Sequence, residues 1–345
     1  MAVPSTYLKT RKRRLIAAIL LAVALAPGTL VRTDIPDRHV LSLGMAELTE
    51  LPESERYGGF TREGVWELAS PNLDFGGYSA LLVLDNGERL RAFSDRGTSL
   101  TFARPESPGE FESSFAHVWN RGRLSRTVPD IEAATRDAAT GDYWLAFESD
   151  HAVIRYSRAS ELEALREPPE WRDWRVNAGA EAMARLPDGR FIVLPEDGLT
   201  GLLYPGDPTR DAEPIRFHVA LPGGLVPTDM AALPDGRVMV LMRRVSWGWP
   251  PFTAALGIAD PNGLQDGDLL EVAQLLDLDR LLPPENYEGL AVQQQANGSH
   301  VLWIIADDNL ASFQRTLLAK LVWDGHLPQA QEKAREGIPR APRIP

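Results

Sequence analysis

The chain has 345 residues, no cysteine and a formal net charge of −12 at pH 7. The lack of cysteine excludes thiol catalysis, disulfide bonds and thiolate metal sites. The excess of acidic residues disfavours binding to nucleic acid or anionic lipid and favours binding to cations. Hydrophobic residues make up 44% of the chain, which is ordinary for a globular protein with a sizeable core.

Residues 1–30 have the plan of a bacterial export signal, because a cluster of cations precedes an apolar run from Leu15 to Ala26. Ala24-Leu25-Ala26 offers a cleavage site, but Pro27 disfavours cleavage there. The apolar run is shorter than the ~20 residues that comfortably span a bilayer. We therefore expect a signal peptide or a signal anchor, with a buried structural helix as the remaining alternative. Both main readings predict a periplasmic or secreted protein, with an inner-membrane anchor facing the periplasm as one form.

Five similar units follow the N-terminal segment. Each has a short apolar strand that starts near an acid or a serine, a tight turn, and a second strand that ends at a charged residue. The lead residues are 53, 49, 48 and 59 residues apart, and they are Ser79, Glu132, Glu181, Asp229 and Glu288. Repeats of about 40–50 residues built from short strands are typical of a β-propeller.

These repeats predict an all-β fold, a six-bladed β-propeller over residues 36–325. Five units show the motif, so the sixth blade would combine a strand at 65–68 with a late strand at 317–323. Such a blade would join the two ends of the chain and leave no open sheet edge. Residues 328–345 are polar and proline-rich, which predicts a disordered C-terminal tail.

The charged ends of the hairpins should lie together. In an antiparallel hairpin the start of the first strand lies beside the end of the second. Equivalent ends of all blades face one side, so one mouth of the channel should carry a ring of carboxylates with a few arginines. The expected neighbours are Glu132 and Glu148, Glu181 and Glu196, Asp229 and Arg243, Glu288 and Asp307-Asp308, and Ser79 and Asp95-Arg96.

Clustered carboxylates raise each other's pKa unless a cation neutralises them, and hard oxygen ligands suit Ca²⁺ or Mg²⁺. We predict a Ca²⁺ site whose candidate ligands are Glu132, Glu181, Asp229, Glu288, Asp307 and Asp308. Arg96 and Arg243 would stabilise negative charge in the transition state, and Glu148 or Glu196 would act as a general base. The alternative is structural: neighbouring arginines and backbone N–H groups would satisfy the same acids.

Several strings of this chain resemble the phytase-like family, also called esterase-like activity of phytase, over roughly residues 55–324. They occupy residues 76–81, 93–97, 130–133, 177–182, 233–237, 286–291 and 306–309. The resemblance implies an exported six-bladed propeller with a hydrolase activity. Where the family commonly has Glu-Gly, this chain has Glu132-Ala133 and Glu181-Ala182. The chain lacks the fingerprint strings of the calcium-dependent alkaline propeller phytases, so the resemblance does not extend to phytate hydrolysis.

Together these features predict an exported, metal-dependent hydrolase of phosphate or carboxylic esters that acts at the acidic mouth. We expect a small anionic ester as substrate, no nucleic acid partner, membrane contact only through an N-terminal anchor, and a monomer. Two alternatives stay open. One is a non-catalytic propeller that serves as a binding or scaffold module of the cell envelope, and the other is a lactonase-like calcium hydrolase.

Overall fold

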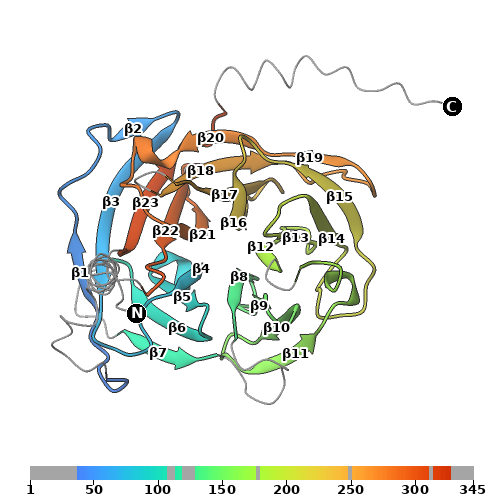
Figure 1. Ribbon diagram of the computed structural model, residues 1–345, viewed down its shortest axis with the longest axis horizontal. Coiled ribbons are helices and arrows are strands. Elements are labelled where there is room, and N and C mark those ends of the chain that lie inside the picture. The colour runs from blue at the N-terminus through green and yellow to red at the C-terminus, as the bar shows by residue number, and fades with distance from the viewer. Residues whose placement is uncertain are drawn as a thin grey trace, which may run out of the picture.

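The computed structural model describes residues 37–106, 113–118, 129–175, 179–247, 251–310 and 314–327. Within these ranges the chain is all-β apart from three short 3-10 helices, at Asp85–Gly87, Pro169–Trp171 and Leu278–Arg280. The strands form five separate sheets. Figure 1 shows the sheets arranged as blades in a ring, with one strand of each blade, the lead strand, facing the central axis. The fold is therefore a β-propeller.

The first four blades follow the chain. The first contains β4 (Tyr78–Leu84), β5 (Arg89–Ser94), β6 (Thr98–Ala103) and β7 (Ser114–His117), and the second contains β8 (Ile131–Arg136), β9 (Tyr143–Phe147), β10 (Ala152–Tyr156) and β11 (Leu162–Arg166). The third contains β12 (Ala180–Arg185), β13 (Phe191–Pro195), β14 (Thr200–Tyr204), β15 (Ile215–Ala220) and β19 (Leu269–Glu271). The fourth contains β16 (Val226–Ala232), β17 (Val238–Val245), β18 (Phe252–Ala259) and β20 (Ala273–Asp277).

The fifth blade joins the two ends of the chain. It contains β21 (Tyr287–Gln294), β22 (His300–Ala306), β23 (Thr316–Trp323), β3 (Phe60–Ala69), β1 (Gly44–Glu47) and β2 (Arg56–Tyr57). β23 pairs with β22 on one side and with β3 on the other, with Thr316 opposite Leu68 and Trp323 opposite Phe60. This closure hides sheet edges that would otherwise be open to another chain.

The prediction of six blades is wrong, because the structure has five. The two strands assigned to a sixth blade, β23 and β3, do pair with each other, but as the third and fourth strands of the fifth blade. The fifth unit supplies only β21, β22 and β23 from its own segment, so β3 is needed to complete its sheet. No strand is left over among the described residues to form another blade.

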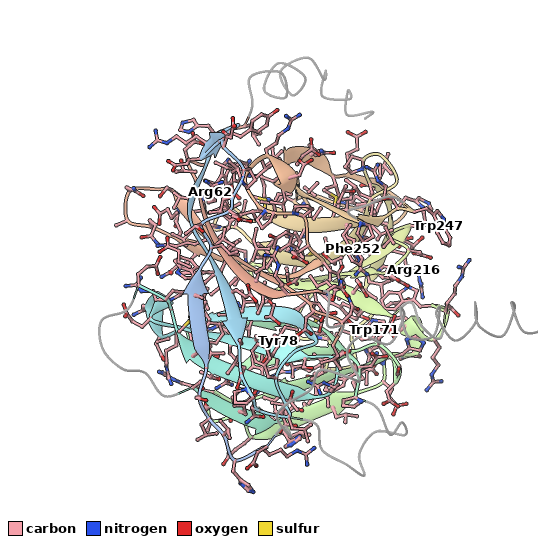
Figure 2. The ribbon with its side chains drawn as sticks, turned by 60° about the vertical axis from the view of Figure 1, so that its left-hand side comes forward. Arg62, Tyr78, Trp171, Arg216, Trp247 and Phe252 are labelled. Atoms are coloured by element: carbon pink, nitrogen blue, oxygen red, sulfur yellow. The ribbon has the colours of Figure 1, made fainter. Side chains whose placement is uncertain are left out.

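Apolar side chains fill the space between neighbouring blades. One buried cluster joins the fourth and fifth blades and includes Leu241, Leu276 and Trp323. Tyr78 and Trp171 are fully buried, whereas Trp247 is fully exposed at the edge of the molecule (Figure 2). Burying a large apolar side chain contributes roughly 1.5–3 kcal/mol, so these layers hold the ring together.

The expected signal or anchor at 1–30 and the expected tail at 328–345 lie outside the described residues. Within the described ranges, no helix has the length and apolarity needed to cross a membrane.

Each lead strand has a β-bulge near its start. The register shifts at the second residue of β4, β8, β12 and β21 and at the third residue of β16. A bulge leaves one residue unpaired and re-aims its side chain. The bulged residues are Ser79, Glu132, Glu181, Thr228 and Glu288.

Candidate functional site

One end of the channel collects acidic side chains from four of the five blades. The second strand of four blades ends beside the start of its lead strand, where the N–H of Asp95, Glu148, Glu196 or Asp307 donates to a carbonyl two residues before the bulge, at 2.8–3.2 Å. The hairpin argument therefore places these residues as the sequence indicated. We call this end the acidic mouth and define it by Asp95, Asp130, Glu132, Glu148, Glu181, Glu196, Glu288, Asp307 and one cation, Arg243.

Three carboxylates of the second blade form the tightest group in the acidic mouth. Asp130, Glu132 and Glu148 each offer an oxygen within 4.8 Å of the others. Asp130 has a positive φ of 52° and accepts a hydrogen bond from the Ser149 hydroxyl. The Gly179 N–H donates to Glu148 Oε1 at 3.1 Å. Donors from two blades therefore orient Asp130 and Glu148. We call Asp130, Glu132 and Glu148 the acidic triad.

The acidic triad fits a divalent cation. Calcium lies about 2.3–2.6 Å from its oxygen ligands, so two ligands on opposite sides of one ion are about 5 Å apart. The 4.8 Å limit on the triad oxygens lies inside this distance. The donor set consists of carboxylates, which suit hard cations such as Ca²⁺ and Mg²⁺. The structure therefore has residues that could hold the predicted ion, centred on Asp130, Glu132 and Glu148.

Burial makes negative charge unfavourable at this site. It raises the pKa of Glu132 well above its usual value, and the carboxylates of Glu181, Glu288, Asp130 and Glu148 raise it further. Burial also raises the pKa of Glu148 to about 7, against the opposing effect of the Gly179 N–H. A nearby positive charge would stabilise the ionised form of carboxylates whose pKa is raised in this way.

Glu181 lies between the acidic triad and the ion pair of the next blades. Its side chain is 7% exposed. Burial raises the pKa of Glu181 well above its usual value, Glu288 raises it further, and Arg243 lowers it. Glu148 and Glu196 also act on Glu181. A nearby cation would lower this raised pKa and leave Glu181 ionised, which is the form that accepts a proton.

Glu288 has a counter-ion of its own. Arg243 Nη1 pairs with Glu288 Oε1 and donates to Asn286 Oδ1 at 2.7 Å. Asn286 Nδ2 donates to the same Glu288 oxygen at 2.8 Å. Burial lowers the pKa of Arg243, but Glu288, Glu181 and Glu132 raise it by more. Arg243 therefore neutralises Glu288, and the structure does not place it as a free clamp for a substrate anion.

Asp229 lies outside the acidic mouth, and its contacts give no support to its assignment as a metal ligand. The bulge in β16 falls on Thr228, so Asp229 takes the next position and faces the neighbouring blade. Asp229 is fully buried; its Oδ1 accepts from the Met230 N–H at 2.8 Å and its Oδ2 from the Leu290 N–H at 2.7 Å. The side chain links the fourth blade to the fifth.

Asp307 and Asp308 have different surroundings although they are adjacent in the chain. Burial and the nearby Glu288 carboxylate together raise the pKa of Asp307 to about 8, so Asp307 interacts with the other acids of the acidic mouth. Asp308 accepts from the Gly77 N–H at 3.1 Å, from the Leu310 N–H at 3.0 Å and from the Thr316 hydroxyl at 3.1 Å. Asp308 therefore ties two loops together, and the expectation that it binds metal gains no support.

Arg96 holds a loop in place. Its guanidinium donates to the carbonyls of Leu73 at 3.2 Å, Phe75 at 2.8 Å and Gly76 at 3.2 Å. These three acceptors engage both Nη atoms of the guanidinium with the loop at 73–76. The predicted role of Arg96 in transition-state stabilisation is therefore not supported by its contacts.

Sequence reasoning missed two residues of this region. Asp130 precedes β8 and is part of the acidic triad, whereas Thr228 is the bulged residue of β16. A signal was present for each. Asp130 stands two residues before the lead Glu132, and Thr228 is a hydroxyl residue that matches Ser79. In both Ser79 and Thr228 the hydroxyl bonds to a carbonyl of the next lead strand.

Residues 73–310 match the phytase-like family, described as esterase-like activity of phytase. The chain belongs to this family. The match covers more than half of the sequence and confirms the resemblance seen in the repeat strings. The family description, esterase-like activity of phytase, indicates a hydrolase-like activity for this phytase-like chain.

The remaining comparisons add no argument about this phytase-like chain. Comparison with curated proteins gives no match. Among solved structures, a luciferin-regenerating enzyme shares 11% identity over 73% of this chain and 94% of that chain, with a TM-score of 0.41. Hydrazine synthase of Kuenenia stuttgartiensis shares 10% identity over 72% and 63%, with a TM-score of 0.36. Both likenesses are too weak to bear on function.

The acidic mouth should make the metal-free phytase-like protein less stable as pH rises. The pKa values of Glu148 and Asp307 are about 7 and about 8 in the folded protein, against usual values of 4.5 and 3.8. At any pH between a group's usual pKa and its raised pKa, the folded state binds more protons than the unfolded state. The free energy of unfolding therefore falls as pH rises through that range. Each such group costs up to roughly 1.4 kcal/mol per pH unit. Urea unfolding in EDTA from pH 5 to pH 8 measures this loss; rising stability over that range would contradict it.

Proposed function

We propose that this phytase-like propeller is a divalent-cation-dependent ester hydrolase that acts at the acidic mouth. The observation that carries the proposal is the acidic triad, in which Asp130, Glu132 and Glu148 offer oxygens within 4.8 Å of one another. The family match supports an esterase-like reaction. Hydrolysis of phosphate or carboxylic esters is the reaction class that both observations favour.

The charge of the chain explains why a cation would be needed. The formal net charge is −12, and the acidic mouth concentrates negative charge around one small volume. An anionic ester would be repelled from such a mouth. A bound Ca²⁺ would supply positive charge and Lewis acidity toward an ester oxygen. Asp130, Glu132 and Glu148 would hold it.

Side chains of the acidic mouth would accept the proton that the attacking water loses. Glu181 lies beside the acidic triad and would accept a proton from the attacking water. Burial raises the pKa of Glu181, and the cation would lower it again, so that Glu181 is ionised near neutral pH and can accept a proton. Arg243 would hold Glu288 ionised and fixed, because the two side chains pair and are only 16% and 12% exposed. From the sequence we expect Glu148 or Glu196 as the base and Glu181 as a metal ligand; here Glu196 acts electrostatically on Glu181 and Glu148.

Calorimetry with Ca²⁺ on chelator-treated protein tests the cation site. We expect binding in the native protein and at least about tenfold weaker binding in Asp130→Asn and Glu132→Gln, since each variant removes one charged ligand. Bound Ca²⁺ should stabilise the fold by about 2.7 kcal/mol at a free concentration 100 times the dissociation constant. Asp307→Asn is the matched control, because Asp307 is a buried acid of the same mouth outside the acidic triad.

A substrate panel tests the reaction. p-Nitrophenyl phosphate, p-nitrophenyl acetate and a simple lactone separate phosphoesterase, esterase and lactonase chemistry. We expect Ca²⁺-dependent turnover of one class. Absence of both metal binding and turnover would favour the non-catalytic propeller. We further propose, from the composition of residues 1–30, that the protein works outside the cytoplasm.

A further inference from the structure

The end of the channel opposite the acidic mouth contains a cavity. Its volume is about 400 Å³, within the roughly 300–1,000 Å³ of small-molecule sites. All five lead strands line it, but with their later residues rather than their first ones. The strands β4, β8, β12, β16 and β21 contribute, among others, Val83, Arg136, Arg185, Met230 and Val292. We call it the distal cavity.

Arg136 in the distal cavity has no counter-ion among the described residues. Its Nη1 donates to the Val83 carbonyl, and its Nε is buried without a partner. The nearest acids have other partners: Asp137 pairs with Arg185 at 2.9 Å, and Asp85 pairs with Arg89 at 2.5 Å. Burial accordingly lowers the pKa of Arg136. A partly buried guanidinium with free donors is an arrangement that an anion would complete.

The rest of the lining is mostly apolar, with a few fixed polar groups. Leu81, Met230, Leu233 and Leu290 are buried and line the cavity. At its rim Gln293 Nε2 donates to the Asn86 carbonyl at 2.6 Å, which fixes that side chain. Because one cation lacks a counter-ion, the site suits a single negative charge. Because most of the lining side chains are apolar, the remainder of the ligand should be largely apolar too.

We propose that the distal cavity binds a small monocarboxylate with an aryl or alkyl body, whose carboxylate pairs with the Arg136 guanidinium. The apolar body lies against Met230 and Val292. This site is separate from the acidic mouth, and its ligand binding does not depend on a bound cation.

Binding of 2-naphthoate, followed by its fluorescence and by calorimetry in EDTA, tests the proposal. We expect saturable one-to-one binding. The neutral analogue 2-naphthamide has the same shape without the charge, so it should bind about ten- to a hundredfold more weakly, the loss expected for one hydrogen-bonded charge. Equal binding of acid and amide would overturn the proposal without any variant being made.

Two variants locate the ligand. Arg136→Gln should weaken 2-naphthoate binding about ten- to a hundredfold. Arg190→Gln is the matched control, because Arg190 is an arginine at the β12–β13 turn that pairs with Asp188 at 2.6 Å outside the cavity lining. Ala232→Phe fills the cavity from a partly buried position and should abolish binding even if Arg136→Gln does not fold. Full affinity in Ala232→Phe would place the ligand elsewhere and overturn the proposal.

Discussion

Glu181→Gln should remove nearly all hydrolysis while leaving the protein folded and able to bind Ca²⁺. Glutamine has the size of glutamate but cannot accept a proton from water at neutral pH. Positioned general bases contribute about 10²–10⁴-fold to rate, so turnover should fall by that factor. The fold should not suffer, because the change removes a buried acid whose pKa is raised by burial and by Glu288. Steady-state rates, calcium calorimetry and urea unfolding in EDTA are the three measurements.

The unfolding measurement separates a catalytic Glu181 from a structural one. If Glu181 were needed for packing, Glu181→Gln would lower the free energy of unfolding. We expect the opposite, a gain in metal-free stability above pH 7, because repulsion with Glu288 and Glu148 is relieved. Residues that raise activity at the expense of stability are characteristic of active sites. Asp307→Asn is the control and should give a similar gain in stability with activity retained. Unchanged turnover in Glu181→Gln would show that the base is another residue.

The propeller could be predicted because its repeat is local. Each lead strand, turn and second strand lies within one short segment, and the charged ends mark the same phase in every copy. The number of blades could not be predicted in the same way, because it depends on pairing between distant strands. From the sequence, β3 and β23 are assigned to a separate blade. In the structure β23 pairs with the free edge of β22, and β3 pairs with β23. Only the long-range pairing shows that these strands complete the fifth sheet.

The acidic mouth as a whole could be predicted, but its individual members could not. Antiparallel pairing explains why Glu132 and Glu148 meet. The side on which a residue points depends on the bulge, and a shift of one residue moves a side chain to the other face. Thr228 and Asp229 are adjacent, so the sequence favoured the acid as the lead residue. The structure gives that position to Thr228, and Asp130 enters the acidic triad through a backbone with positive φ.

The contacts of Asp229 lead to the second large effect, which concerns stability. Asp229→Ala leaves the N–H groups of Met230 and Leu290 without acceptors at a fully buried position between two blades. Each unsatisfied buried group costs about 1–3 kcal/mol, so we expect a loss of about 2–6 kcal/mol in the free energy of unfolding.

Asp229→Asn tests the same two hydrogen bonds with a side chain of the same size. Its side-chain oxygen can still accept one of the two hydrogen bonds, but its NH₂ group cannot accept the other, so about half of the loss should remain. Urea unfolding gives both values, and calorimetry should show unchanged Ca²⁺ affinity in Asp229→Asn. If Asp229→Asn instead lost Ca²⁺ and kept its stability, Asp229 would be a metal ligand after all. A stability loss with intact binding would show that this acid joins the blades, because the two N–H donors of β16 and β21 then depend on it.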